Sequence, residues 1–346
     1  MVDMKQWREN IERWLNQVWY QNSAWVYLLL PLSKLYFWLS HQYKARYLDG
    51  RKTMQSLRVP VIVVGNITVG GTGKTPVVIA LVEHLRQRGW KVGVISRGYG
   101  GQATQFPLRV NQSVSPSLCG DEPRMIFDRT GVSVVVDPDR VRGARFLLSH
   151  DPVDIIVSDD GLQHWAMKRD LEIVVVDGQR LFGNFQLLPA GPLREPIERL
   201  AQVDFVLVNG DPQWVFPVPY NLVNLTPTGF IAVKPHLKTN SLDEFKTLYP
   251  KVHAVAGIGN PQRFFDSLRK LGIEVIEHPF PDHHFYSKDD LKFDDTYPVV
   301  MTEKDAVKCA SFASDNWWYL AVTAQLETRF LAELDNRLNS KKVIRV

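Results

Sequence analysis

The sequence predicts an α/β protein with a mostly parallel sheet flanked by helices and a second, smaller α/β domain. The first observation is an unbroken β-branched run at residues 61–64, which is typical of a strand buried on both faces. The second is the alternation of further apolar runs with helical segments, the pattern of βαβ units. The third is an apolar, aromatic stretch at residues 24–39, which predicts an additional N-terminal membrane-associated helix.

A glycine-rich segment joins the first strand to its helix. It reads TVGGTGKTP over residues 68–76, and apolar residues then recur at helical spacing until Gly89. Because glycine lacks a Cβ atom, the backbone can adopt positive φ and approach a phosphate, while amides at the helix start face the anion. Strand, glycine turn and helix in this order predict a phosphate-binding loop and a P-loop NTPase-like core. The residues expected to hold the nucleotide are Thr68, Val69, Gly70, Gly71, Thr72, Gly73, Lys74 and Thr75.

Two side chains of this loop have expected roles. Lys74 should reach the β- and γ-phosphates, and the Thr75 hydroxyl should ligate Mg²⁺. Pro76 fits the first turn of a helix, where one N–H can be spared. Thr68 departs from the usual G-x-x-x-x-G-K-[ST] pattern, which begins with glycine. The competing interpretation is a structural glycine turn before a lysine, but the flanking strand and helix favour a nucleotide site.

Acidic residues follow a later strand, which we expect at residues 153–157. Asp159 and Asp160 come just after it. Open α/β sheets bind ligands at the carboxyl ends of their strands, and nucleotide enzymes hold Mg²⁺ there, directly or through water. We therefore expect Asp159 and Asp160 to hold the metal together with Thr75. The alternative is an ordinary turn that contains two aspartates.

Two further loops carry groups suited to proton transfer. Asp121 and Glu122 precede Pro123, so we expect Glu122 to be extended and a helix to begin near the proline. Capping that helix is a competing role for both carboxylates. The segment PDHH at residues 281–284 carries two adjacent histidines. It supplies too few ligands for a zinc site, so a histidine paired with a carboxylate for proton handling is the favoured interpretation.

The composition disfavours some functions. The 346 residues are 45% hydrophobic, which is enough for a substantial core, and the net charge is +4. Residues 1–58 hold nine Lys/Arg and four Asp/Glu, a net charge of +5, so the remainder has a net charge of −1. Because the basic excess coincides with an apolar stretch, a nucleic-acid partner is not expected. Two cysteines give no disulfide framework and fit a reducing compartment.

The stretch AWVYLLLPLSKLYFWL at residues 24–39 is the most apolar part of the chain. It is shorter than the ~20 residues of a spanning helix and contains Pro31 and Lys34. No small-residue cleavage site follows, so it does not read as a signal peptide. Aromatic and basic flanks suit an anionic leaflet and predict a monotopic helix at a membrane surface, the alternative being a buried helix that covers the core. The flanking residues are Trp19, Tyr20, Lys44, Arg46, Arg51 and Lys52.

The length of the chain suggests about two domains. A proline-rich connection at residues 188–196 predicts a boundary close to residue 200. We expect an N-terminal helical segment at 1–58, a core at 59–200, a smaller α/β domain at 201–328 and a C-terminal helix at 329–346. The smaller domain should contain strands at 205–208, 251–256, 273–276 and 298–302.

Taken together, these motifs resemble those of the tetraacyldisaccharide 4′-kinase family of Gram-negative bacteria. The similarity runs in order over nearly the full chain and includes the apolar N-terminal helix, and a phosphate loop without its first glycine is itself a family trait. The matching segments are GNITVGGTGKTP (65–76), SRGYGG (96–101), GDEP (120–123), DDGLQH (159–164), LPAGPLREP (188–196), FPDHH (280–284) and TEKDAVK (302–308).

The resemblance implies a kinase that transfers the γ-phosphate of ATP to the 4′-hydroxyl of a tetraacylated glucosamine disaccharide 1-phosphate in lipid A biosynthesis. It implies Mg²⁺ and a peripheral position on the cytoplasmic side of the inner membrane, with no obligate protein partner. The catalytic pair of the family carries over to Asp121 and His283, and its metal-binding acids to Asp159 with Asp160 beside it. His284 is less suited because the motif places its histidine directly after the aspartate.

A P-loop GTPase or ATPase that acts as a switch or maturation factor on a protein partner is the main alternative. A GTPase should also carry an Asn/Thr-Lys-x-Asp motif that reads guanine, but in Thr302-Glu303-Lys304-Asp305 the lysine comes one place late. A membrane-tethered ATPase without a lipid acceptor is a second alternative. Comparing ATP with GTP binding, and adding the lipid acceptor, would separate these possibilities.

Overall fold

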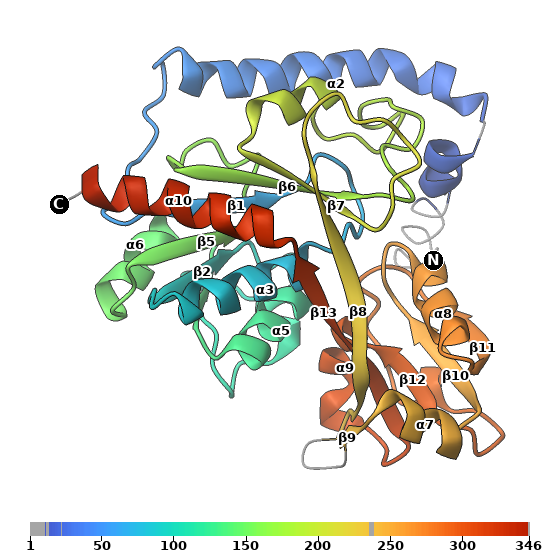
Figure 1. Cartoon of the computed structure of the whole chain (residues 1–346). Helices are drawn as coiled ribbons and strands as arrows, with labels where there is room; N and C mark the ends of the chain where they lie inside the picture. Colours follow the sequence, from blue (N-terminus) through green and yellow to red (C-terminus); the bar gives the residue numbers. More distant parts are fainter. Residues whose placement is uncertain (1–10, 12–13, 22, 235–238, 345–346) are drawn as a thin grey trace.

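The strands of the protein form one long, twisted sheet. The structure is a computed structural model that describes residues 11, 14–21, 23–234 and 239–344, without the side chains of residues 341–344. The strand order is β11-β10-β12-β13-β8-β7-β6-β1-β5-β2-β4-β3, and β9 pairs with β8. Figure 1 shows the two ends of this sheet as two lobes, which we call the core lobe (β1–β7) and the small lobe (β10–β12).

The core lobe is a mostly parallel sheet, as the sequence predicts. Strand β1 (Val61–Gly65) lies between β5 (Ile155–Asp159) and β6 (Leu171–Asp177), and all five of its residues are buried. A strand covered on both faces accounts for its unbroken apolar run. The other strands of this lobe are β2 (Val92–Ser96), β4 (Ser133–Val136), β7 (Phe205–Asn209) and the antiparallel edge strand β3 (Leu108–Arg109).

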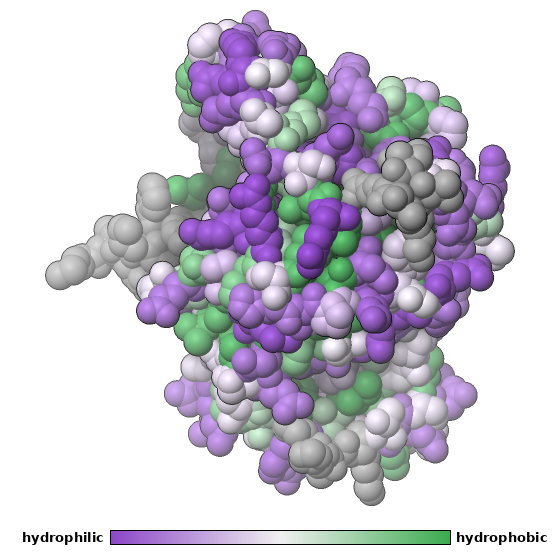
Figure 2. Space-filling view, turned by 90° about the vertical axis from the view of Figure 1, so that its left-hand side faces the viewer, coloured by the Kyte–Doolittle hydropathy of each residue, from purple (hydrophilic) through white to green (hydrophobic). Residues whose placement is uncertain are grey.

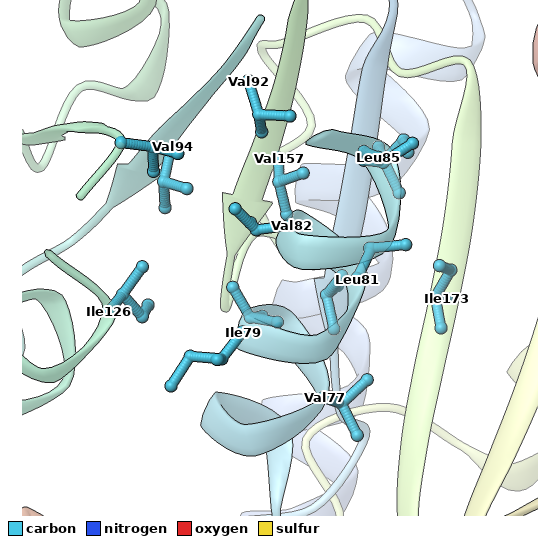
Figure 3. Packing of buried hydrophobic residues seen from close by; sticks show 14 of the residues in the cluster. Val77, Ile79, Leu81, Val82, Leu85, Val92, Val94, Ile126, Val157 and Ile173 are labelled. Carbon is cyan, nitrogen blue, oxygen red and sulfur yellow. The ribbon is translucent and has the colours of Figure 1, made fainter. Parts of the chain in front are cut away.

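Helices cover both faces of the core lobe. Apolar side chains of α3 (Lys74–Gln87) recur at helical spacing and pack on β2, β5 and β6. Figure 3 shows Leu81, Val82 and Leu85 of α3 directed toward the strands that carry Val157 and Ile173. Helices α5 (Asp121–Thr130) and α10 (Thr328–Ile344) share this face, and α6 (Arg140–His150) covers the other. The remaining short helices are α4 (Pro116–Cys119), η1 (Ile197–Gln202), η2 (Asp289–Leu291) and η3 (Ala310–Phe312).

Two long antiparallel strands join the lobes, and the sequence did not predict them. Strand β8 (Asn221–Ala232) pairs along its length with β13 (Trp317–Leu326), with a register shift between Ala321 and Val322. Pro227 and Gly229 interrupt the apolar alternation of β8, which hides it from a pattern search. The small lobe adds β9 (Thr239–Asn240), β10 (Lys251–Ala256), β11 (Glu274–Pro279), β12 (Val299–Thr302), α7 (Leu242–Leu248), α8 (Pro261–Lys270) and α9 (Glu303–Cys309).

The N-terminal apolar helix α2 (Trp25–Leu48) is longer than the predicted stretch and runs along the top of the molecule in Figure 1. Ser33 is its one fully buried residue. Figure 2 shows one face of the molecule, on which polar residues are spread over most of the surface with apolar residues between them. None of the helices in the described part of the chain has the length and apolarity needed to cross a bilayer. The large apolar side chains exposed on α2 are Trp25, Tyr27, Leu28, Leu32, Leu35, Phe37, Trp38, Leu39, Tyr43 and Leu48.

Two local predictions were wrong. The strand expected at residues 153–157 is β5, which begins at Ile155 and ends at Asp159, so this aspartate belongs to the strand itself. Glu122 is helical rather than extended, because α5 begins at Asp121. The first turn of a helix tolerates a proline, because the N–H that proline lacks would have no helical partner there. The chain changes direction at Gly120 (φ +91°), the residue before α5 begins. The domain boundaries at 58, 200 and 328 stay predictions.

Candidate active site

The phosphate loop leaves β1 and ends where α3 begins, at Lys74. Gly70 (φ +105°) and Gly73 (φ +86°) adopt backbone angles that residues with a Cβ rarely reach. Thr68, by contrast with these glycines, forms an antiparallel β-bridge with Leu193. A residue in such a bridge is extended, and an extended backbone does not require glycine. The departure from the common glycine pattern therefore has a local cause.

Side chains from outside the loop support its second half. The Asn209 amide, at the end of β7, donates to the Thr72 carbonyl over 3.1 Å, and Arg263 of α8 donates to the Asn209 side-chain oxygen over 2.6 Å. A Cβ atom at Gly259 would lie 2.7 Å from the amide nitrogen of Gly71. The small lobe thus touches the tip of the phosphate loop.

Asp160 lies directly opposite Lys74. The Lys74 ammonium is 3.6 Å from Asp160 Oδ1, and the Arg194 guanidinium donates to both Asp160 oxygens at 3.2 and 3.1 Å. Burial alone would raise the pKa of Asp160, but Lys74 and Arg194 hold this pKa well below its usual range. Asp160 is therefore ionised and already engaged by two cations.

Asp159 has a different environment from its neighbour. Its Oδ2 accepts a hydrogen bond of 3.0 Å from the Ser96 hydroxyl at the end of β2, while its buried Oδ1 has no hydrogen-bond partner among the described residues. Burial, then the charges of Glu122 and Asp160, raise the pKa of Asp159 to about 7 against the opposing effect of Lys74. Nearby cations only partly offset the burial of this carboxyl group, and its free oxygen is a setting that favours a bound cation.

The second group of predicted residues comes together from both lobes. Asp121, at the start of α5, and His283, in the loop after β11, place Oδ2 and Nδ1 3.2 Å apart. His283 adopts a left-handed backbone (φ +59°), and the Tyr99 ring lies edge-on to its imidazole at 4.8 Å. Asp121 is buried, and burial alone would raise its pKa, but Lys304, His283 and Lys308 hold this pKa below its usual range.

Lys304 of α9 completes this cluster, and the sequence assigned it no role there. Its ammonium lies 3.2 Å from Glu122 and from Asp282, and 3.9 Å from Asp121. Burial lowers the pKa of Lys304, but these carboxylates outweigh it and hold the pKa well above its ordinary value, so the side chain is charged. Because the ammonium is also 3.2 Å from His283 Nε2, a neutral imidazole would accept there and carry its proton on Nδ1. Nδ1 and Asp121 Oδ2 are an ion-pair distance apart, but they do not form a hydrogen bond with each other.

The two clusters share one site. The segment after β2 joins them: Ser96 donates to Asp159 over 3.0 Å, and a Cβ atom at Gly100 would lie 3.2 Å from His283 Nδ1. Glu122, which raises the pKa of Asp159, also contacts Lys304. His284, by contrast, lies against Phe280 and Tyr286 and 3.6 Å from Asp290. No group of three or more His, Cys, Asp or Glu side chains that could hold a metal is found in the described part of the chain.

Comparison with known proteins agrees with this geometry. The family model described as "Tetraacyldisaccharide-1-P 4'-kinase" matches residues 25–339. The chain belongs to the tetraacyldisaccharide 4′-kinase family. Proteins named tetraacyldisaccharide 4′-kinase from Alcanivorax borkumensis and Pseudomonas fluorescens are each 48% identical, the first over 96% of this chain and 99% of its own length, the second over 94% and 95%.

A solved structure of the family is similar over most of the fold. The LpxK protein of Aquifex aeolicus, crystallised in complex with ATP, is 30% identical and superposes with a TM-score of 0.77 over 90% of this chain and 99% of its own. The α/β fold with its N-terminal helix is therefore confirmed.

Sequence reasoning missed four residues that the structure places at the candidate site. Ser96 and Arg194 lie in quoted motifs but had no assigned partner, and they contact Asp159 and Asp160 respectively. Asn209 and Lys304 are brought in by β7 and α9. Their partners are remote in sequence, so only the family motif around Lys304 offered a signal, and none pointed to Asn209.

Proposed function

We propose that this chain is a kinase that transfers the γ-phosphoryl group of ATP to the 4′-hydroxyl of a tetraacylated glucosamine disaccharide 1-phosphate, a step of lipid A biosynthesis. The observation that carries the proposal is the meeting of a phosphate loop and an Asp121–His283–Lys304 cluster in one site of a chain of this family. The first group suits a nucleotide, and the second suits removal of a proton from an alcohol.

Phosphoryl transfer has a loose transition state, so positioning and charge neutralisation dominate its catalysis. The amides of residues 68–75 and the Lys74 ammonium would hold the β- and γ-phosphates and stabilise the charge that develops on them. The Asp160 carboxylate faces the Lys74 ammonium from the opposite side of the site, at 3.6 Å.

Mg²⁺ is the expected companion of ATP, and the residues present fit it. The buried, unpaired Oδ1 of Asp159 is suited to a cation, and the Thr75 hydroxyl lies in the first turn of α3. When bound, the ion would neutralise phosphate charge. Asp160 is a weaker candidate ligand than Asp159, because Lys74 and Arg194 already occupy its oxygens.

Asp121 is the proposed proton acceptor. Its depressed pKa keeps it ionised at neutral pH and makes it a weak base, so the sugar hydroxyl should lose its proton late, as the new P–O bond acidifies it. His283 Nδ1 lies 3.2 Å from the Asp121 carboxylate, close enough to orient it, and Lys304 lies 3.2 Å from the opposite ring nitrogen. General base catalysis of this kind contributes typically ~10²–10⁴-fold.

The exposed apolar side chains of α2 suit an amphiphilic acceptor. We place α2 at the cytoplasmic surface of the inner membrane, with Trp25, Leu28 and Trp38 at the level of the acyl chains and headgroups. The acceptor can then keep its acyl chains in the leaflet while its sugar reaches the site. Flotation with liposomes tests this placement: a variant with Leu28, Leu32 and Leu35 changed to Ser should leave the lipid fraction, and equal recovery would contradict it.

The switch alternative is disfavoured by the surroundings of Asp305. This aspartate accepts hydrogen bonds from the Gly257 amide and the Thr302 hydroxyl, and Lys308 lies 2.7 Å from it, so it cannot also read a guanine base. Lys304 points into the Asp121 cluster instead of toward the phosphate loop. ATP should therefore bind more tightly than GTP.

The direct test uses radiolabelled ATP, Mg²⁺ and the lipid disaccharide acceptor, with products resolved by thin-layer chromatography. A labelled lipid that forms only when acceptor, ATP and protein are all present supports the kinase. Release of inorganic phosphate at a rate unchanged by the acceptor would instead indicate an ATPase without a lipid substrate.

A further inference from the structure

Two hydroxyl groups of the exposed helix α2 point inward. Ser33 donates to the Leu187 carbonyl over 2.8 Å and accepts from the Ala190 amide over 3.0 Å, and Tyr36 donates to the Arg194 carbonyl over 3.0 Å. All three partners are backbone groups of one segment, residues 187–195, which we call the strap. In Figure 1 the yellow-green connections of the core lobe lie directly under α2.

The other side of the strap holds the phosphate loop. The Val69 amide donates to the Pro192 carbonyl over 2.8 Å, the Arg194 amide donates to the Ile67 carbonyl over 2.7 Å, and Thr68 bridges Leu193 between them. Three successive residues of the loop are therefore paired with the strap. The Arg194 side chain extends the same connection to Asp160.

We propose that Ser33 and Tyr36 are positioning residues for ATP, acting through the strap on the first half of the phosphate loop. The inference rests on the proposed nucleotide site and goes beyond it, because it makes a helix outside the nucleotide-binding core part of the nucleotide machinery. A purely lipid-facing helix needs no hydroxyls toward the protein. Here they are the groups that fix the helix to the segment on which the loop is built.

Removing the Ser33 hydroxyl should loosen the phosphate loop through the strap. Without Ser33 Oγ, the buried amide of Ala190 loses its hydrogen-bond partner, and an unpaired buried polar group is expensive. The Leu187 carbonyl keeps a second hydrogen bond, from the Gly191 amide. The strap relieves the loss at Ala190 by shifting toward water, and residues 67–69 shift with it. The amides that face the phosphates then lose alignment, while Asp121 and His283, held by α5 and by the loop after β11, do not.

The test is the double variant Ser33→Ala/Tyr36→Phe in the full chain. The KM for ATP should rise about tenfold, because the lost hydrogen bonds together stabilise the loop by roughly that factor. The KM for the lipid and the recovery on liposomes should stay at the wild-type level. Equilibrium binding of a fluorescent ATP analogue should weaken by the same factor. Ser33→Thr, which keeps the hydroxyl, should restore binding at that position.

A matched control changes hydroxyls on the same helix that do not touch the strap. Ser40 bonds only within α2, to the Phe37 carbonyl, and Tyr27 is 75% exposed, so Ser40→Ala/Tyr27→Phe should leave ATP binding unchanged. The proposal is overturned if the control weakens ATP binding as much as the test variant, or if the folded test variant binds ATP as wild type does. Should the double variant not fold, Tyr36→Phe alone decides by the same two readouts. ATP binding is measured without a lipid acceptor, so failure of the kinase proposal and failure of this one give different results.

Discussion

The phosphate loop and the Asp121 cluster lie in one site but are built in opposite ways. Eight consecutive residues, 68–75, supply the loop, and most of its chemistry can be read from them in order. The cluster takes Asp121 and Glu122 from α5, Asp282 and His283 from the loop after β11, and Lys304 from α9. A local motif thus defines binding, whereas proton handling depends on how the small lobe sits against the core lobe.

This difference predicts separable functions. The loop is supported by Asn209 and by the strap, and it does not contact Asp121 or His283 through any interaction found among the described residues. Changes in the loop should affect ATP affinity and turnover together. Changes in the cluster should affect turnover with little effect on ATP affinity.

Among changes outside the proposed base, the largest effect is expected in the loop. Lys74→Ala removes the one loop cation that faces the phosphates, so kcat should fall roughly 10²–10³-fold and the KM for ATP should rise as well. Steady-state kinetics at several ATP concentrations measures both. Lys74→Arg is the matched control and should recover part of the affinity. A fall in kcat with unchanged ATP affinity would contradict the assignment of Lys74 to binding.

A smaller effect, visible in pH dependence, is expected at Lys304. Asp121 faces Lys304 and Lys308 of α9 and His283 of the loop after β11, and the cations lower its pKa. Because the base must be ionised, Lys304→Met should raise the pKa of Asp121 and move the acid limb of kcat to higher pH by about 1–3 units. Lys304→Arg should move the limb less. A limb that moves to lower pH, or does not move at all, would show that Lys304 does not act on the base.

The smallest effect is expected at Thr68. Thr68→Gly restores the common glycine pattern but removes a side chain from an extended, strap-paired position, where glycine costs about 0.5–1 kcal/mol of stability. Thermal unfolding should show a slightly lower midpoint, and the KM for ATP should not improve. Tighter ATP binding by the glycine variant would mean that the strap pairing is not what makes threonine suitable here.

The parts of the fold that the sequence could predict were those with local signals. The parallel strands of the core lobe, helix α3 and the strands of the small lobe follow from apolar runs and helical spacing. Strand β8 could not be predicted, because it contains Pro227, Gly229 and exposed polar residues and its stability comes from pairing with a strand more than 80 residues away. Strand β13 was missed although its sequence, WWYLAVTAQL, is largely apolar.

The site shows the same limit. The residues of the phosphate loop were identified from their own sequence, whereas Asp121 and His283 needed the family resemblance before they could be paired. Lys304 could be noticed only as part of a motif, because its partners are distant in sequence. Two of them lie at the start of α5, at residues 121–122, and two in the loop after β11, at residues 282–283. The assignments of nucleotide-binding, catalytic and metal-binding residues and of the membrane face stay predictions.

The most direct test of this division is Asp121→Asn, which keeps the size of the side chain and removes the proton acceptor. Equilibrium ATP binding and single-turnover transfer of labelled phosphate to the lipid acceptor should be measured on the same preparation, beside wild type. We expect ATP binding close to that of wild type and transfer slower by ~10²–10⁴-fold. Collapse of ATP binding, with undiminished transfer from the ATP that still binds, would contradict the role of Asp121 as the base.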